Sequence, residues 1–262
     1  MFAGINSSPL IMVAPNGARR NKGHHQNLPV SIEEIRDETV ACARAGADAL
    51  HLHVREPSGK HTLDAGIYKE AIGEIQKVLP GFPIQVTTES AGIFSVEEQL
   101  HCLNQLRPAA ASISVREIAR SPQLSTKLYG LCEDQGIAVQ HILYDRSDWQ
   151  KLETWRSSGV IHSGQDDVIF VLGAYDPPTT ATVSDVQKLS RLFALSPGRV
   201  MVCAFGAKEH EVLCNAAMHG ADLRIGFENN IQGPDGKPAT SNAANVARLK
   251  AALDAASTGV TS

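Results

Sequence analysis

Hydrophobic and polar positions alternate in blocks along this chain. Short apolar runs that end in polar residues are each followed by a longer stretch with the period of an amphipathic helix. Eight such runs predict β-strands, over residues 9–16, 49–56, 83–89, 109–117, 138–145, 167–174, 199–206 and 222–229. Helical stretches fall between these runs and after the last one, so the pattern indicates repeated strand–helix units.

The first and last helices carry the clearest end signals. Ser31 and Glu34 stand at capping-box spacing before the first helical stretch, and Gly46 follows its last turn. The final helix is predicted over roughly 241–256. Because no linker-like or low-complexity segment interrupts the chain, we expect a single domain over residues 1–262.

The number of units favours a closed barrel. Eight strand–helix units in 262 residues match the count and length of a (β/α)₈ TIM barrel. The competing α/β fold, a doubly wound open sheet, usually carries a glycine-rich phosphate fingerprint after its first strand. Here that turn reads PNGARRNKGHH, which does not fit the fingerprint. We therefore predict an α/β fold of the (β/α)₈ TIM barrel type.

Polar residues gather where several predicted strands end. Since side chains alternate across a strand, the pattern also predicts which of them point into the barrel. The inward set is Asn16, then His51, His53 and Arg55, Gln85, Thr87 and Glu89, Ser112, Ser114 and Arg116, and finally Arg224, Gly226 and Glu228. Barrel interiors are normally filled by Val, Ile and Leu, whereas barrel enzymes place active-site residues at the carboxyl ends of strands. The second and eighth strands flank the first, so we expect their polar ends to meet above the barrel mouth.

His51, His53 and Glu228 form a candidate metal site. Neutral imidazoles and a carboxylate suit Zn²⁺ with a fourth position open, and they also suit Fe²⁺, so ligand type alone does not fix the metal. The alternative is a pair of buried histidines satisfied by other polar groups. We interpret five further histidines as structural or solvated, and alternation does not settle the facing of His141. These five are His61, His101, His162, His210 and His219.

The segment after the first strand, NGARRNKGHHQNLP, is long and basic and should lie on the catalytic face. Its basic residues either clamp a carboxylate or phosphate, or they belong to a solvated loop. They are Arg19, Arg20, Lys22, His24 and His25. The chain as a whole has a net charge of −4, and no basic tract suggests nucleic acid or a membrane surface.

The remaining bulk features predict a cytoplasmic protein. The five cysteines are odd in number and scattered, which is typical of reduced thiols and not of a disulfide framework. The first ten residues show no signal peptide pattern, and no stretch of 18 apolar residues predicts a membrane span.

The sequence resembles the β-keto acid cleavage enzymes, the family of the 3-keto-5-aminohexanoate cleavage enzyme. The pieces NLPVSIEEI, AGADALHLHVRE, IQVTT, FVLG and GADLRIGFENN occur in order along nearly the whole chain. HLHVRE and RIGFENN are the specific ones. The resemblance implies a (β/α)₈ barrel, usually tetrameric, with one Zn²⁺ per chain on His51, His53 and Glu228.

The resemblance also implies a reaction. In this family a β-keto acid and acetyl-CoA, the co-substrate, give acetoacetate and a new CoA thioester by a retro-Claisen-type acyl exchange. Zn²⁺ can polarise the β-keto oxygen as a Lewis acid. Arg224 matches the family arginine that binds and orients the substrate carboxylate, and Thr87 keeps a hydroxyl where the family has serine.

The chain departs from the family at its proposed general base. The family motif Glu-Asp-Asn reads Glu228-Asn229-Asn230 here, and an amide cannot accept a proton at neutral pH. The catalytic role of the family aspartate is therefore vacant at Asn229. Our candidate replacement for this base is Glu89, and the next candidates are Glu117 and Asp145. Alternatively, Glu89 has no catalytic role and only forms an ion pair with Arg116 or Arg19.

Further departures concern the substrate. The better-known members read Thr-Gly-Ala-Glu after the first strand, where this chain reads Asn16-Gly17-Ala18-Arg19. The fourth strand ends SVRE, where small and hydroxyl residues are usual. We expect four residues to contact the substrate, namely Asn16, Arg19, Ser114 and Arg116. The chain is thus a divergent branch, and its β-keto acid or related carboxylate is not named by the sequence.

Two other functions remain open. A metal-dependent barrel hydrolase or lyase acting on a small carboxylate also uses an H-x-H pair, although amidohydrolases place it on the first strand. A non-catalytic binding protein that kept the metal and lost the base is the third hypothesis, because of Asn229. We expect a small-molecule carboxylate substrate and a homo-oligomer, with neither a nucleic acid nor a membrane as partner.

Overall fold

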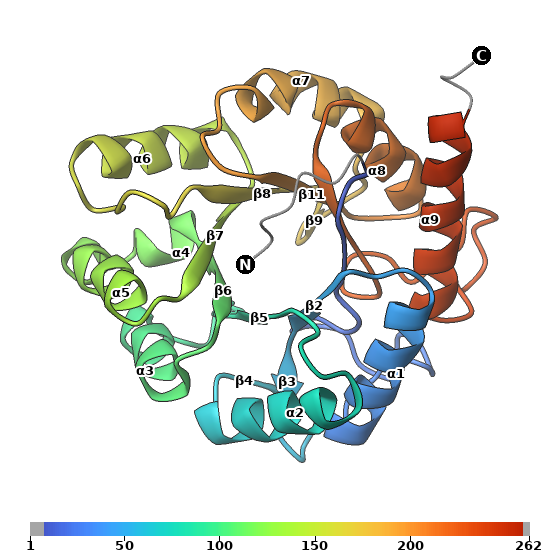
Figure 1. Cartoon of the computed structure of the whole chain (residues 1–262), viewed down its shortest axis with the longest axis horizontal. Coiled ribbons are helices and arrows are strands. Elements are labelled where there is room, and N and C mark those ends of the chain that lie inside the picture. Colours follow the sequence, from blue (N-terminus) through green and yellow to red (C-terminus); the bar gives the residue numbers. More distant parts are fainter. Residues whose placement is uncertain (1–7, 259–262) are drawn as a thin grey trace.

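The computed structural model describes residues 8–258, and they form a closed (β/α)₈ barrel (Figure 1). Its parallel strands are β1 (Ile11–Val13), β2 (Ala49–Leu52), β5 (Ile84–Thr87), β6 (Ala110–Ser114), β7 (Ala138–Leu143), β8 (Asp167–Leu172), β11 (Val200–Ala204) and β12 (Asp222–Ile225). Each strand pairs with its neighbour in chain order, and β12 pairs with β1 to close the ring. The predicted fold is confirmed, and β2 and β12 do flank β1.

Helices surround the ring on its outer side (Figure 1). They are α1 (Ile32–Arg44), α2 (Ala65–Val78), α3 (Val96–Leu106), α4 (Val115–Ile118), α5 (Pro122–Asp134), α6 (Arg146–Ser157), α7 (Val183–Phe193), α8 (Glu209–Met218) and α9 (Asn242–Thr258). The predicted capping box of α1 is present, with Ser31 and Glu34 each bonding the other's backbone N–H. Such a cap satisfies N–H groups that have no partner within the helix.

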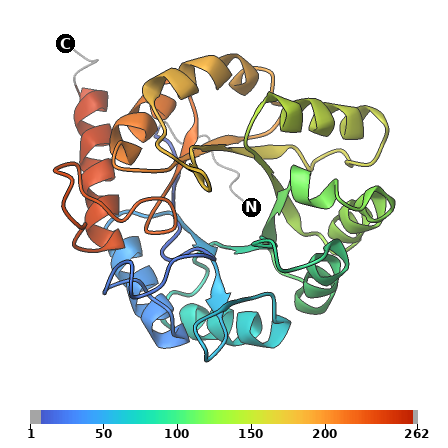
Figure 2. The same cartoon turned by 180° about the vertical axis from the view of Figure 1, so that it is seen from behind.

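Two short antiparallel hairpins lie outside the barrel sheet. One pairs β3 (Val54–Arg55) with β4 (His61–Thr62), and the other pairs β9 (Ala174–Tyr175) with β10 (Pro178–Thr179). Figure 2 shows the β9–β10 hairpin reaching over the ring of strands. This hairpin therefore forms part of the wall of the barrel mouth.

All eight predicted strands are longer than the strands of the barrel sheet, and the difference matters most at three of them. The predicted strands 49–56, 109–117 and 222–229 end in the barrel sheet at Leu52, Ser114 and Ile225. Arg55 consequently lies in β3, where it donates hydrogen bonds to backbone carbonyls of the loop after β1 and does not point into the barrel. Arg116 lies in the short helix α4, which begins directly after β6.

The end of β12 has a clear steric cause. Gly226 has a φ of +150°, and a Cβ at this position would lie 2.2 Å from the carbonyl oxygen of Ala14. Only glycine allows so close an approach of two backbones, so the chain leaves the ladder here and turns. The turn that follows carries Glu228 over the barrel mouth.

Alternation correctly divides the apolar residues between two layers. Leu50, Leu52, Leu223 and Ile225 pack in the large core between the sheet and the helices. A smaller cluster fills the barrel interior, formed by Met12, Ala49, Ile142, Ile169, Val171, Met201, Cys203 and Phe205. Phe227 belongs to neither layer, because it packs with Leu28 and Ala239 under the loops.

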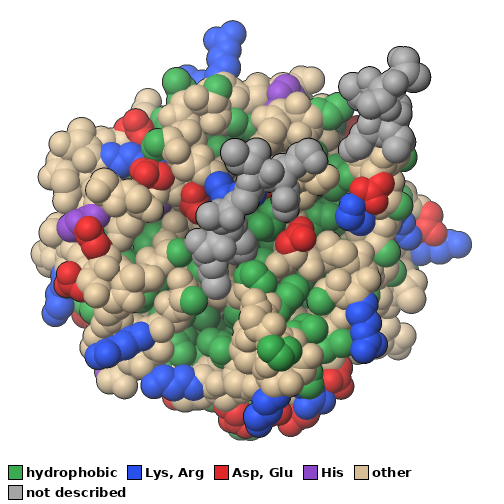
Figure 3. All heavy atoms as spheres, in the orientation of Figure 1, with side chains coloured by type: hydrophobic (Ala, Val, Ile, Leu, Met, Phe, Trp, Pro, Cys, Tyr) green, Lys and Arg blue, Asp and Glu red, His purple; other side chains and the backbone are tan. Residues whose placement is uncertain are grey.

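The surface and the cysteines agree with the bulk composition. Acidic and basic side chains are intermixed on the face shown in Figure 3. All five cysteines are free, and four of them are buried. Among residues 8–258, no helix has the length and apolar character that crossing a membrane requires. The signal-peptide prediction concerns the first ten residues, most of which lie outside the described residues.

Candidate metal and substrate site

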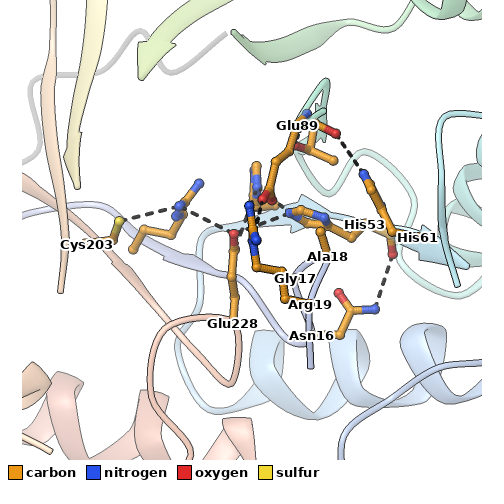
Figure 4. Close-up of polar contacts among 12 residues, drawn as sticks. Asn16, Gly17, Ala18, Arg19, His53, His61, Glu89, Cys203 and Glu228 are labelled. Carbon is orange, nitrogen blue, oxygen red and sulfur yellow. Dashed lines mark hydrogen bonds and ion pairs between the residues drawn. The ribbon is translucent and has the colours of Figure 1, made fainter. Parts of the chain in front are cut away.

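The structure brings His51, His53 and Glu228 together at the barrel mouth, each of them buried. The Nε2 atoms of His51 and His53 lie 3.1 Å apart, and they lie 3.7 and 3.4 Å from the nearer carboxylate oxygens of Glu228. Figure 4 shows the side chains of Glu228 and His53 converging. One ligand atom from each residue can therefore face a common point.

Hydrogen bonding prepares His51 to be a ligand. Its Nδ1 lies 2.8 Å from Oε1 of Gln85, an atom that can only accept, so Nδ1 carries the proton and Nε2 keeps a lone pair. Gln85 is held in turn, since its Nε2 donates to Oε1 of Gln140 at 3.1 Å. This arrangement is the one typical of metal-bound histidines.

Electrostatics keep His51 and Glu228 in their ligating forms. Burial lowers the pKa of His51 well below its usual value, and Arg224 lowers it further, so the ring is neutral. Burial acts to raise the pKa of Glu228, but Arg224, His53 and His51 outweigh it and lower that pKa, so the carboxylate is ionised. Neutral imidazoles beside a carboxylate form a donor set that fits Zn²⁺ or Fe²⁺.

Arg224 lies beside this cluster on β12. Its Nη2 lies 3.7 Å from Glu228 and 3.4 Å from the sulfur of Cys203. Its Nε and Nη1 atoms are buried and have no hydrogen-bond partner among the described residues. A buried guanidinium with free donors is a strong attachment point for a carboxylate.

A cavity of about 280 Å³ opens beside these groups. His51, Glu228 and Arg224 line it, as do Thr87 and Ser114 from the ends of neighbouring strands. Ser114 has a hydroxyl without a hydrogen-bond partner among the described residues, whereas the Thr87 hydroxyl accepts the N–H of Glu89. The cavity therefore joins the candidate metal ligands to a wall of hydroxyl and guanidinium groups.

Glu89 also lines the cavity, and Arg19 pairs with it at 3.5 Å (Figure 4). Burial raises the pKa of Glu89, against the lowering effect of His53. The pairing with Arg19 matches one of the two partners considered from the sequence. Glu89 is thus a cavity-lining carboxylate of raised pKa whose arginine partner is partly exposed.

The two other candidate bases are engaged elsewhere. Glu117 lines the cavity, but its carboxylate accepts bonds from the N–H and hydroxyl of Ser90 and from the side chain of Gln99. Asp145 caps α6 and pairs with Arg116. These contacts hold both carboxylates in structural roles.

Arg116 reaches the cavity wall with its guanidinium already bound. It pairs with Asp148 and Asp145 and stacks on the ring of Tyr144, whose centroid is 4.2 Å from the guanidinium carbon. Because the strand ends at Ser114, Arg116 is displaced from the inward position that alternation predicts. The guanidinium of Arg116 therefore packs against the ring of Tyr144 and holds it in place.

Asn16 and Asn229 are both buried and lie outside the lining of the cavity. The amide nitrogen of Asn16 donates to the carbonyls of Pro29 and His53, which fixes the loop after β1 against β2. The amide atoms of Asn229 have no hydrogen-bond partner among the described residues.

Most basic side chains of the loop after β1 form contacts within the protein. Lys22 pairs with Glu34, His24 bonds Asn21, and His25 bonds the carbonyl of Ala239. Of its five basic residues, Arg19 alone lines the cavity among the described residues. The loop is therefore largely a structural element of the barrel mouth.

The other histidines can now be placed. His141 points outward, where its Nε2 lies 2.8 Å from the carbonyl of Gln165 and its ring packs on Tyr129. His61 lies closer to the site, since its ring packs on His53 and its Nε2 lies 2.8 Å from the carbonyl of Glu89. Its position indicates a support behind His53.

Sequence reasoning missed two tyrosines that line the cavity. Tyr144 follows β7, and Tyr175 lies on the β9–β10 hairpin. Tyr175 donates a hydrogen bond to the backbone carbonyl of Glu228. The polar end of β7, YDR, was the available signal for Tyr144, but no pattern in a loop indicates the position of Tyr175.

A family model described as beta-keto acid cleavage enzyme matches residues 9–262. The chain belongs to this family. The 3-keto-5-aminohexanoate cleavage enzyme of Fusobacterium nucleatum subsp. nucleatum is 26% identical, over 92% of this chain and 89% of its own length. The protein of the same name from Acetoanaerobium sticklandii is 27% identical, over 89% and 87%.

A further relative is the 3-oxoadipate:acetyl-CoA acetyltransferase of Cupriavidus necator. It is 24% identical, over 92% of this chain and 87% of its own length. These relatives are named as cleavage enzymes and acetyltransferases, and this member of the family is likewise an enzyme.

Solved structures show the same fold. The apo structure of ObcA matches with a TM-score of 0.69 at 16% identity, over 88% of this chain and 62% of that chain. The 3-dehydroquinate dehydratase of Geobacillus kaustophilus matches with a TM-score of 0.65 at 11% identity, over 97% and 93%. At these identities the likeness concerns the barrel alone.

Proposed function

We propose that this enzyme carries out a zinc-dependent acyl exchange between a β-keto acid and acetyl-CoA. The products are acetoacetate and the CoA thioester of the remaining acyl group. In net terms, the deprotonated α-carbon bonds to the acetyl carbonyl carbon and displaces CoA from it. The CoA sulfur then bonds to the keto carbon of the substrate, and the bond between that carbon and the α-carbon breaks, with a proton returned to the α-carbon. The exchange balances without an oxidant, a reductant or net proton release.

The observation that carries the proposal is the pairing of two binding features in one cavity. His51, His53 and Glu228 offer three ligand atoms to one point, and the free donors of Arg224 lie beside them. A β-keto acid has its carboxylate and keto oxygen on either side of a single carbon. A metal ion held by the three ligands would bind the keto oxygen, and the guanidinium of Arg224 would bind the carboxylate.

A divalent ion at this site supplies Lewis-acid polarisation of the keto oxygen. Arg224 binds the substrate carboxylate and thereby orients the α-carbon. Glu89 is the proposed base that removes a proton from the α-carbon, in place of the aspartate that the family has at position 229. Its burial and raised pKa suit a group that must both accept and return a proton.

The relatives' names support the exchange chemistry. They include 3-oxoadipate:acetyl-CoA acetyltransferase and, over 40% of this chain and 34% of its own length, a 3,5-dioxohexanoate:acetyl-CoA acetone transferase. Each name contains a keto acid and acetyl-CoA. We propose the same two classes of substrate here, without choosing the side chain of the keto acid.

We further propose a homotetramer in the cytoplasm, by resemblance to the family. The free, mostly buried cysteines are consistent with a reducing compartment. Sedimentation analysis of the purified protein tests the oligomeric state.

The test of the function combines metal analysis with an exchange assay. His51→Ala and Glu228→Ala should each remove most of the bound metal, because each deletes one of three protein ligands. The wild-type protein should form acetoacetate and a CoA thioester from at least one β-keto acid of a panel. Full metal occupancy in both variants contradicts the ligand assignment, and hydrolysis without CoA favours a hydrolase instead.

A further inference from the structure

The turn that carries Glu228 is held through three consecutive carbonyl groups. Arg20 donates from Nη1 to the carbonyl of Phe227 at 2.6 Å and from Nη2 to the carbonyl of Asn229 at 3.2 Å. Between them, the hydroxyl of Tyr175 donates to the carbonyl of Glu228 itself. Two side chains from different loops thus bind the peptide groups on both sides of the candidate metal ligand.

The N–H groups of the same turn bond to other parts of the fold. Phe227 donates to the side-chain oxygen of Asn242 at 2.7 Å, and Glu228 donates to the carbonyl of Ala14 at 3.1 Å. The N–H groups of the turn are therefore held by Ala14, which follows β1, and by Asn242 at the start of α9. On its carbonyl side, Arg20 and Tyr175 are the side-chain donors, and the backbone N–H of Gly206 also donates to the carbonyl of Asn229, at 3.4 Å.

Arg20 and Tyr175 also contact each other. The guanidinium carbon of Arg20 lies 5.4 Å from the centroid of the Tyr175 ring, within the range of a cation–π contact. The backbone carbonyl of Arg20 accepts a hydrogen bond from Arg55, which fixes the loop on that side. The pair therefore acts as one support, built from the loop after β1 and the β9–β10 hairpin.

The support determines where the Glu228 carboxylate points. A side chain leaves the backbone along the Cα–Cβ bond, so the orientation of the flanking peptide groups sets the direction of the carboxylate. Irregular turns have no ladder to satisfy their carbonyls, and a buried carbonyl without a donor is costly. If the donors were lost, the turn could rotate and carry Glu228 away from His51 and His53.

We infer that Arg20 and Tyr175 are positioning residues for metal binding by Glu228. This role rests on the proposed metal ligation and extends it, since neither residue offers a ligand atom. It also assigns a role to Arg20 that the basic loop did not reveal, because its guanidinium binds carbonyls instead of a substrate anion. Groups that orient metal ligands typically affect metal affinity strongly when removed.

The experiment measures the Zn²⁺ affinity of metal-free protein by competition with a chromophoric chelator. Tyr175→Phe deletes one hydroxyl, and Arg20→Met deletes the guanidinium. Each should weaken Zn²⁺ binding on the order of 10–100-fold. Arg20→Lys should fall between wild type and Arg20→Met, because an ammonium group can replace one donor of the fork but not its geometry.

Two control variants separate this role from general effects. Tyr144→Phe removes the other phenol of the cavity, and Lys22→Met removes a cation of the same loop that pairs with Glu34. Both should bind Zn²⁺ as wild type does. The double variant Arg20→Met/Tyr175→Phe should lose less affinity than the product of the two single losses, since both side chains hold the same turn.

The outcomes are distinguishable. If Glu228→Ala binds Zn²⁺ as tightly as wild type, the proposed metal ligation fails. If Glu228→Ala loses the metal while Tyr175→Phe and Arg20→Met bind normally, the positioning role fails although the ligand set stands. A lowered unfolding temperature of the metal-free variants, with unchanged Zn²⁺ affinity, shows that the pair only stabilises the fold and overturns the inference.

Discussion

Nδ1 of His51 and Oε1 of Gln85 lie 2.8 Å apart across neighbouring barrel strands. His51 and Gln85 are direct neighbours in the register of β2 and β5, so the hydrogen bond follows from the strand pairing itself. The bond fixes the tautomer of His51 and aims its Nε2 at Glu228. The pairing of β2 with β5 thus orients the candidate ligand His51.

This relationship gives the first prediction. Gln85→Leu should weaken Zn²⁺ binding on the order of 10–100-fold, because His51 loses the acceptor that holds its proton on Nδ1. Gln140→Leu, one hydrogen bond further from the metal, should have a smaller effect. Chelator competition measures both. Equal affinities for wild type and Gln85→Leu would show that His51 is oriented by packing alone.

The second prediction concerns Arg224. Arg224→Lys should lower kcat/KM more than about ten-fold, or roughly 1.4 kcal/mol, because a lysine cannot reproduce the bidentate contact with a carboxylate. Steady-state kinetics on the β-keto acid identified by the panel measure this effect. An unchanged kcat/KM would indicate that the guanidinium only fills the barrel interior.

The third prediction concerns Glu89 and pH. A base works in its ionised form, and burial raises the pKa of Glu89 above its usual value of 4.5. The kcat/KM should therefore fall as the pH drops through this raised pKa. This fall should occur at a higher pH than it would for an exposed glutamate. Glu89→Gln should lower kcat on the order of 10²–10⁴-fold and abolish that acid limb. Normal turnover by Glu89→Gln would place the base elsewhere.

The fourth prediction concerns Glu209, which is buried at the start of α8 under the turn after β12. Burial raises its pKa from 4.5 to about 8, against the lowering effect of the N–H of Gly226 and of Asn230. The folded protein therefore holds a proton that the unfolded chain releases more readily. The stability that this provides is fully present below pH 4.5 and is lost as the pH rises through 8.

Glu209→Gln removes this titration. Between pH 5 and pH 9, the unfolding temperature of the metal-free wild type should fall by a few degrees more than that of the variant. The size of this difference follows from the relation between unfolding free energy and unfolding temperature in domains of this kind. Calorimetry at both pH values measures the difference. Parallel pH curves for the two proteins would mean that Glu209 is ionised in the fold.

The sequence by itself determined the barrel and the residues of the candidate metal site. Strand–helix alternation repeats eight times, and the order of strands in a closed barrel follows the order of the chain. His51 was predicted to point inward because the period of two is a property of the strand backbone itself. Glu228 was placed over the barrel mouth correctly, although it stands in a turn and not in the strand that was predicted to carry it.

Only the tertiary structure decided what happens beyond the strand ends. Arg116 turns to Asp148 because a helix starts after Ser114, and Arg20 turns to the carbonyls around Glu228 because a glycine ends β12 there. Tyr175 reaches the site from a hairpin more than 50 residues before Glu228 in the chain. Loops have no fixed period, so their side chains are oriented by partners distant in sequence, and local patterns do not contain those partners.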